Sequence, residues 1–290
     1  MSGIGTGRLL AWPAFLIAGL LGGIPMALVI ACSLMKPGAF GGVEWGLSFD
    51  AYRALLFRRD IFSGEPVFSA DHLLIYGRSI LLAAGTTILC LAIGFPTAAH
   101  MATRPPRARK WWVLAITLPF WTSLLVRTLA LMLIIGDQGL INGLLLRTGL
   151  IQAPVAMLHT NFAVLLGLVY SFLPFMVLPV FAALERLDPR LVEAGADLYA
   201  GRWRIAFLVI LPNIRPGLVA GCLLVFLPAL GSYVVPLMLG GGRAMMAGDL
   251  IALQFGGARN WPLGAAEAVA LVTLVLAALL PCWLMRGRAG

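Results

Sequence analysis

The charged residue best placed to act on a solute is Arg127, which lies inside a long apolar run. Charged side chains in such runs are costly to bury in a membrane and generally mark a pathway or a paired site. Counted from Trp111, Arg127 is about 24 Å along a helix, near the outer edge of a hydrocarbon core of roughly 30 Å. Two roles remain open. Arg127 could snorkel to lipid headgroups, or it could line an outer gate and pair with Asp137.

Three further side chains suit a solute that carries an ammonium group. The Asp137 carboxylate would hold such a group, although the run GDQG at 136–139 equally favours a turn or a cap. Trp121 and Tyr233 offer ring faces to a cation, or they serve as interfacial and packing aromatics. The sequence leaves both roles open for each residue.

No pattern in the sequence indicates catalysis or a metal site. The histidines show no i, i+4 pair, and each cysteine lies in an apolar run without a C-x-x-C spacing. The Gly-x-x-x-x-Gly-Lys-Ser/Thr motif of ATP-binding loops is missing as well, so we expect no ATP hydrolysis by this chain. The residues concerned are His72, His100, His159, Cys32, Cys90, Cys222 and Cys282.

The composition indicates an integral membrane protein. Of 290 residues, 61% are apolar and 11% are charged, whereas soluble domains are about half apolar and a quarter charged. Disorder requires low hydrophobicity and is excluded. The net charge of +9 comes from scattered residues rather than a basic stripe with interleaved aromatics, so nucleic-acid binding is excluded too.

Six runs have about the length and apolarity that a membrane-spanning helix requires. They do not alternate polar and apolar residues, as barrel strands do. We therefore predict an all-α polytopic membrane protein with helices over residues 9–35, 79–101, 111–135, 162–184, 218–239 and 268–285. Prolines are expected to interrupt spans three to five and to leave irregular backbone along a pathway. They are Pro119, Pro174, Pro179, Pro228 and Pro236.

The positive charges in the connecting segments predict the orientation. With a cytosolic N-terminus, inner segments hold twelve Lys and Arg residues and outer segments hold eight. The short loop RPPRARK at 104–110 carries four of them and no acid. Both termini are therefore expected in the cytosol. The first span, with VIAC at 29–32, could be a lipoprotein-like signal, but its apolar stretch exceeds the 7–15 residues of such signals and favours a retained helix.

The inner segment at 185–217 is unusually long and mixed in charge. Its sequence favours helix over 191–208, and Leu211-Pro212 and the run RPG at 215–217 are expected to end that helix before span five. We predict two short surface helices, which form either a solvated loop or a docking surface. Leu191, Leu198, Ile205 and Leu208 are expected to face the bundle, and Glu193, Asp197, Arg202 and Arg204 the cytosol.

This segment resembles the EAA loop of the membrane subunits of binding-protein-dependent ABC importers. The matching residues are EAGADL at 193–198, Gly201 and ILP at 210–212. In that family the loop forms a coupling helix that docks in a groove of a cytosolic ATPase. Gly195 stands where the family has a second Ala, and Tyr199 where it has Gly. The resemblance implies that ATPase coupling falls to Glu193, Ala194, Gly195, Asp197, Leu198, Gly201, Leu211 and Pro212.

Three other runs resemble the spermidine/putrescine permease group. PFWTSLLVRT at 119–128 and GDQGLIN at 136–142 look like its third-helix signature, and PALGSYVVP at 228–236 is similar to its fifth-helix exit. Some polyamine permeases carry acids in the last signature, where this chain has Ser232 and Leu237. Ser232 joins Trp121, Arg127, Asp137 and Tyr233 as a candidate pathway residue. The resemblance covers about 74–285, so we expect a first helix with an outer segment at 1–73, a permease core at 74–285 and a cytosolic tail at 286–290.

The resemblance implies a permease subunit, itself no enzyme, of an ATP-driven importer in a bacterial inner membrane. The implied partners are a second homologous permease, an ATPase dimer that holds ATP-Mg, and a periplasmic binding protein. The expected solute is a polyamine such as spermidine or putrescine, and the alternative is an opine, an aminophosphonate or an amino-acid-like solute. A stand-alone secondary transporter predicts inverted repeats and paired intramembrane acids, and a membrane enzyme predicts a polar constellation within the spans; the sequence shows neither pattern.

Overall fold

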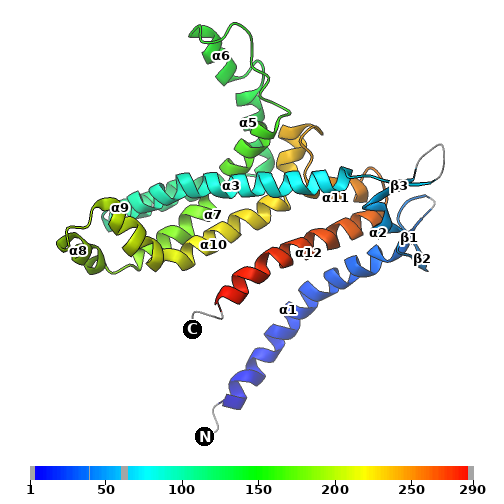
Figure 1. Cartoon of the computed structure of the whole chain (residues 1–290), viewed down its shortest axis with the longest axis horizontal. Coiled ribbons are helices and arrows are strands. Elements are labelled where there is room, and N and C mark those ends of the chain that lie inside the picture. Colours follow the sequence, from blue (N-terminus) through cyan, green and yellow to red (C-terminus); the bar gives the residue numbers. More distant parts are fainter. Residues whose placement is uncertain (1–3, 39, 60–64, 287–290) are drawn as a thin grey trace. The chain divides into compact units, whose positions relative to one another are not determined.

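The computed structural model describes residues 4–38, 40–59 and 65–286, most of which are helical (Figure 1). The contacts divide the chain into two compact units. One unit comprises the residues up to 74 together with those from 250 onward, and the other comprises residues 75–249. Of the predicted tail at 286–290, the residues beyond Arg286 lie outside the described part of the chain.

The first unit is built from two long helices and two small β hairpins. Helix α1 packs along α12 (Figure 1). The hairpins are antiparallel and pair β1 with β2 and β3 with β4. The bounds are α1 Ile4–Ser33, β1 Met35–Pro37, β2 Val43–Leu47, α2 Asp50–Ala54, β3 Phe57–Arg59, β4 Pro66–Phe68 and α12 Trp261–Arg286.

The hairpins correct the prediction that the chain is entirely helical. Gly41 and Gly42 lie in the turn between β1 and β2 with φ of 93° and 82°. Glycine adopts such angles without steric cost, which lets the chain reverse tightly there. In the second hairpin the rings of Phe57 and Phe68 pack edge to face, with centroids 6.1 Å apart, which favours that strand pairing.

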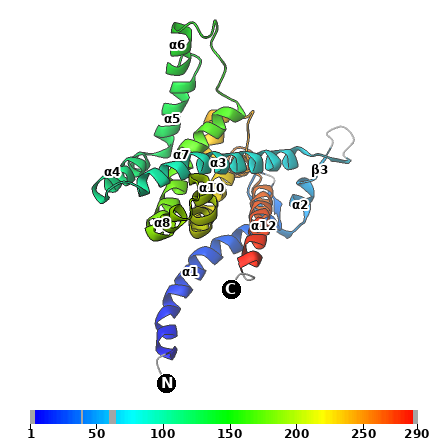
Figure 2. The same cartoon turned by 60° about the vertical axis from the view of Figure 1, so that its left-hand side comes forward.

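The second unit is a layer of long helices in which α7 packs against α10. Figure 2 shows α5 and α6 standing away from α3, α7 and α10. The helices are α3 Asp71–Ala102, which begins in the first unit, α4 Pro106–Thr117, α5 Leu124–Ile135, α6 Leu140–Arg147, α7 Asn161–Glu185, α8 Pro189–Asp197, α9 Arg202–Ile205, α10 Leu211–Leu230 and α11 Ala247–Phe255, which ends in the first unit. Shorter turns are the 3-10 helix η1 Leu118–Trp121 and the π-helical segments η2 Ala206–Ile210 and η3 Pro236–Gly240.

Small residues set the distance between α7 and α10. A Cβ atom built on Gly217 of α10 would lie 2.4 Å from the Cβ of Ala183 and 2.9 Å from the carbonyl oxygen of Pro179. Position 217 therefore has no room for a side chain. Close backbone contact of this kind is typical of packed membrane helices, and it places the two ends of the segment 185–211 next to each other.

The described residues include four helices that are long and apolar enough to cross a membrane: Asp71–Ala102, Leu124–Arg147, Asn161–Glu185 and Trp203–Leu230. Two shorter apolar helices, Gly19–Ser33 and Trp261–Ala277, coincide with the first and last predicted spans. The structure is thus that of a polytopic membrane protein, and the count of six spans stays a prediction.

The predicted span over 111–135 consists of two helices joined by a break. Helix α4 ends at Thr117, η1 follows, and Thr122 is extended before α5 begins at Leu124. Pro119 lies in the first turn of η1, where it lacks the backbone N–H that a continuing α-helix would use and its ring crowds the preceding turn. The interruption expected at this proline is confirmed.

Other expectations about prolines were wrong. The run RPG at 215–217 and Pro228 lie inside α10, which continues through both. Pro174 and Pro179 lie inside α7, which continues unbroken, because neighbouring helices in a bundle can compensate for the lost backbone bonds. Pro212 does not end a helix either, since it lies in the first turn of α10, where a missing N–H costs little. The helix of the predicted fifth span accordingly ends at Leu230, before Gly231, instead of at residue 239.

Candidate coupling and pathway sites

The segment from Asp188 to Ile205, called the coupling hairpin below, joins α7 to α10 by way of α8 and α9 (Figure 1). Asp188 caps α8, since its carboxylate accepts a hydrogen bond of 3.0 Å from the backbone N–H of Arg190. Pro189 follows in the first turn, where its fixed φ suits a helix start. The predicted pair of short helices is therefore present.

Gly195 forms the contact between the two helices of the coupling hairpin. It is buried, and a Cβ built on it would lie 3.3 Å from Cγ1 of Ile205 and 3.8 Å from Cγ2 of Val209. Ile205 is itself buried, as predicted for a residue that faces the bundle. The hairpin thus closes on one small residue and one branched side chain.

The same prediction was wrong for Leu191, Leu198 and Leu208, which are exposed. The helical repeat on which it rested is interrupted twice. Helix α8 ends at Asp197, so Leu198 lies outside it, and Leu208 lies in the π-helical segment η2, where the spacing of side chains differs from 3.6 residues per turn.

Tyr199 ends α8 in the conformation that usually requires glycine. Its φ is 55°. Its N–H donates to the carbonyl of Ala196 at 2.9 Å, and the N–H of Ala200 donates to the carbonyl of Gly195 at 3.1 Å. This pair of bonds is the Schellman motif, in which the left-handed residue is commonly Gly. Gly201 does not take over the role, because its φ is not positive and it begins α9 instead.

The coupling hairpin exposes both charge and apolar surface. Glu193 and Asp197 are exposed four residues apart, hence on one face of α8. In the same hairpin, the side chains of Leu198 and Trp203 are 82% and 78% exposed. Among the predicted coupling residues Gly195 is buried and Leu211 is half-buried, whereas Glu193, Ala194, Asp197, Leu198, Gly201 and Pro212 are exposed.

Arg109 is a structural residue of this region that the sequence analysis did not single out. Its guanidinium donates to the carbonyls of Ala102 and Arg104 at 2.6 and 2.7 Å, and Nη1 lies 3.3 Å from Oε1 of Glu185. It therefore connects the end of α3, the start of α4 and the end of α7. The basic run RPPRARK indicated only membrane orientation, because a capping contact from a distant helix has no sequence signature.

Arg127 contacts an aromatic ring rather than an acid. Its guanidinium carbon lies 4.9 Å from the ring centroid of Phe120. Nε and Nη1 are buried and have no hydrogen-bond partner among the described residues. Eight residues separate Arg127 from the end of α5, about 12 Å along the axis, and Asp137 lies beyond that end. The described residues therefore show no ion pair between Arg127 and Asp137.

The other pathway candidates lie at breaks between helices. Trp121 ends η1 and is exposed, and Ser232 and Tyr233 lie between α10 and η3, where Tyr233 is exposed. Gly248 of α11 packs against this link so closely that a Cβ built on it would lie 2.5 Å from the carbonyl oxygen of Gly231 and 2.7 Å from that of Ser232. Helix α11 thus supports one wall of the link.

Asp249, the next residue, was not identified from the sequence. It is 4% exposed, and its Oδ2 has no hydrogen-bond partner among the described residues. Burial raises the pKa of this carboxyl above its usual value, because the charged form loses hydration. The signal that could have found Asp249 is a single acid flanked by apolar residues, in the run AMMAGDLIAL at 244–253.

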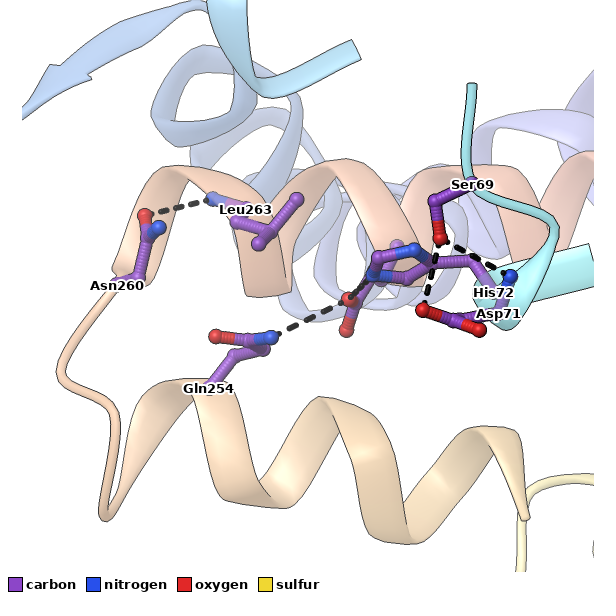
Figure 3. A network of polar contacts seen from close by, with 7 residues as sticks. Ser69, Asp71, His72, Gln254, Asn260 and Leu263 are labelled. Atoms are coloured by element: carbon purple, nitrogen blue, oxygen red, sulfur yellow. Dashed lines mark hydrogen bonds and ion pairs between the residues drawn. The ribbon is translucent and has the colours of Figure 1, made fainter. Parts of the chain in front are cut away.

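A polar network lies in the first unit (Figure 3). His72 Nε2 is 3.3 Å from Oε1 of Glu267, and Nε2 of Gln254 is 3.5 Å from the same oxygen. Glu267 is completely buried in α12. The network borders a pocket of about 940 Å³. Its polar lining residues are Asp50, Arg53, Ser69, Asp71, His72, Gln254 and Asn260.

Comparison with known proteins identifies similar chains. Residues 90–285 match the family model described as "Binding-protein-dependent transport system inner membrane component". The chain is 36% identical to the spermidine/putrescine transport system permease protein PotB of Haemophilus influenzae, over 87% of this chain and 84% of that protein. It is 34% identical to PotB of Escherichia coli, over 90% of each chain.

The fold is similar to that of a solved membrane protein. A chain from the crystal structure of a bacterial ABC transporter involved in the import of the acidic polysaccharide alginate superposes with a TM-score of 0.66. The match covers 98% of both chains at 18% sequence identity. At 18% sequence identity, this similarity shows a shared fold.

Proposed function

This chain belongs to the inner-membrane components of binding-protein-dependent transport systems, and on that premise we propose that its coupling hairpin transmits the ATPase cycle of partner subunits to a polyamine pathway. The chain is a permease subunit of an ABC importer and is not an enzyme. In the proposed cycle, ATP-Mg is held by a cytosolic ATPase dimer, and the membrane subunits alternate between inward and outward states. Such alternation is a shift between two populations that bind ATP and solute differently.

The observation that carries this proposal is the surface of the coupling hairpin. The hairpin exposes two acids, Glu193 and Asp197, and two large apolar side chains, Leu198 and Trp203. Exposed apolar surface of this kind suits contact with a partner protein. The Schellman turn and the contact of Gly195 with Ile205 fix the shape of this surface. A rigid projection between two long helices suits the transfer of a displacement from the ATPase to the membrane.

The proposed assembly contains a second homologous permease, the ATPase dimer and a periplasmic binding protein. We place both termini in the cytosol with six spans, on the basis of the excess of positive charge in the inner segments. The coupling hairpin is then cytosolic, where an ATPase is accessible. In the same topology the pocket of the first unit lies on the outer side.

The proposed solute is a polyamine such as spermidine or putrescine. Two relatives at 36% and 34% identity over most of the chain carry spermidine/putrescine transport in their names. Trp121, Asp137, Ser232 and Tyr233 provide the oxygen atoms and ring faces that suit ammonium groups. Arg127 lies against Phe120, and in a pathway it would instead attract a carboxylate or phosphonate. An amino-acid-like, opine or aminophosphonate solute is the second candidate for this reason.

Charge reversal in the coupling hairpin tests the coupling role. In a reconstituted complex with its partner subunits, Glu193→Lys is expected to lower ATP-driven uptake by at least about tenfold, since reversing an interfacial charge opposes docking. ATP hydrolysis should then no longer rise when loaded binding protein is added. The matched control is Glu65→Lys in the outer segment, which is expected to leave both rates within about twofold. Wild-type uptake by the Glu193→Lys complex would reject the coupling role.

A further inference from the structure

We infer that Asp249 is a specificity-determining residue that receives an ammonium group of the transported solute beside the link between α10 and η3. The inference rests on the proposed function and adds a residue to its pathway. Asp249 is not among the pathway residues that the sequence predicted.

The first step is the state of the Asp249 carboxylate. It is 96% buried and Oδ2 accepts no hydrogen bond from the described residues. No Lys, Arg or His among those residues forms an ion pair with it. An unpaired buried carboxylate is costly, and such groups in native structures require a specific explanation. Glu267, a second buried acid among the described residues, differs in that His72 and Gln254 contact its Oε1.

The second step is the placement of α11. The hydroxyl of Ser79, which is buried in α3, accepts a hydrogen bond of 2.7 Å from the N–H of Ala247 and donates to the carbonyl of Ile75 at 2.8 Å. Gly248 is held against the carbonyl oxygens of Gly231 and Ser232. The first turn of α11 is thus fixed from two sides, and Asp249 has a defined position beside a broken helix.

The third step is the chemistry of this position. An ammonium group has donors only, and it binds best where carboxylate and carbonyl oxygens converge. Gly248, the residue before Asp249, packs against the carbonyl oxygens of Gly231 and Ser232 at the end of α10. Unwound backbone next to an acid is a common way for membrane proteins to hold cations. The run from Gly231 to Gly242 contains no acid, so in the proposed site the negative charge beside this link would come from Asp249, the residue that follows Gly248.

The fourth step is access from the subunit surface. Gly231 and Tyr233 of the link are exposed and Ser232 is half-buried. The exposed ring of Tyr233 offers a second, cation–π contact to an amine. The proposed route to the carboxylate runs through this link, and a displacement of the break during transport would open it to the solute.

The test compares Asp249→Asn with Asp71→Asn in the complete reconstituted complex, with spermidine and putrescine as probes. Asp71 is an exposed acid at the start of α3, so its replacement removes the same charge outside the pathway. We expect Asp249→Asn to lower the uptake of both amines by at least about tenfold, the usual effect of losing a hydrogen bond to a charged group. Basal ATP hydrolysis should stay within about twofold of wild type, and Asp71→Asn should change neither rate.

Thermal unfolding of the same complexes is a second readout. Removing an uncompensated buried charge should leave the solute-free Asp249→Asn complex at least as stable as wild type, whereas loss of a structural residue would lower its Tm. The inference about Asp249 is overturned if the Asp249→Asn complex takes up both amines at wild-type rates. It is also overturned if that complex has both a lower Tm and slow uptake. Either result leaves the proposed function intact. A wild-type complex that transports neither amine overturns the proposed solute and this inference with it.

Discussion

Gly195 in α8 and Ile205 in α9 lie so close that a Cβ at position 195 would be 3.3 Å from Cγ1 of Ile205. Because both residues are buried, this contact fixes the angle between the two helices of the coupling hairpin. The charged and apolar side chains that α8 exposes are therefore presented in one arrangement. The proposed coupling surface thus depends on a residue that is itself buried.

The size of residue 195 should determine whether the coupling hairpin keeps its shape. Gly195→Ala adds one methyl group that a small shift of the flexible Ile205 accommodates, and Ala favours helix, so stability should change by less than about 1 kcal/mol. Gly195→Leu should cost about 1–3 kcal/mol through overpacking and should lower uptake. Thermal unfolding and ATP-driven uptake of the reconstituted complex measure both effects. Equal behaviour of the two variants would contradict the contact described above.

The left-handed backbone at Tyr199 predicts an unusual order of substitutions. An L residue in this conformation is strained by roughly 1–2 kcal/mol, asparagine tolerates it better, and β-branched residues tolerate it least. Tyr199→Asn should therefore leave the Tm of the complex unchanged or higher, and Tyr199→Val should lower stability by about 1 kcal/mol. The side chain is 98% exposed, so neither variant removes an internal contact. The account of the Schellman turn is wrong if the valine variant is the more stable one.

Arg109 should contribute more to stability than its ion pair alone. Glu185→Gln removes a partly exposed ion pair and should cost less than about 1 kcal/mol. Arg109→Ala also removes the hydrogen bonds to the carbonyls of Ala102 and Arg104, and it should cost about 1–3 kcal/mol. Chemical or thermal unfolding of the two variants distinguishes these contributions. If both variants lose the same small amount, the carbonyl contacts are not significant.

The sequence predicted the features that depend on composition and on local pattern. Apolar length placed the membrane helices, and Pro119 predicted the break that separates α4 from α5. Sequence reasoning failed where long-range packing decides. Pro174 and Pro179 continue inside α7 because neighbouring helices compensate for their lost bonds, and Pro212 begins a helix that it was expected to end.

The candidate site shows the same division. The sequence over 191–208 predicted the two short helices, and the Gly position of the EAA-like pattern coincides with the left-handed residue Tyr199. The burial of Asp249 and Glu267 had no sequence signature, because each acid looks like an ordinary charge at a helix start. Only the approach of other segments, such as Ser79 toward α11 or His72 toward α12, distinguishes these acids from exposed ones.

Photo-crosslinking from Trp203 tests the central claim most directly, because it reports what the coupling hairpin touches. A photoreactive phenylalanine derivative would replace Trp203, which is 78% exposed, or Trp45, a control in β2 that is 95% exposed. Both replacements exchange one exposed aromatic ring for another. In intact cells that express the whole importer, position 203 is predicted to crosslink to the ATPase subunit and position 45 is not. An adduct of position 203 with a periplasmic protein, or no adduct with the ATPase, would contradict the account.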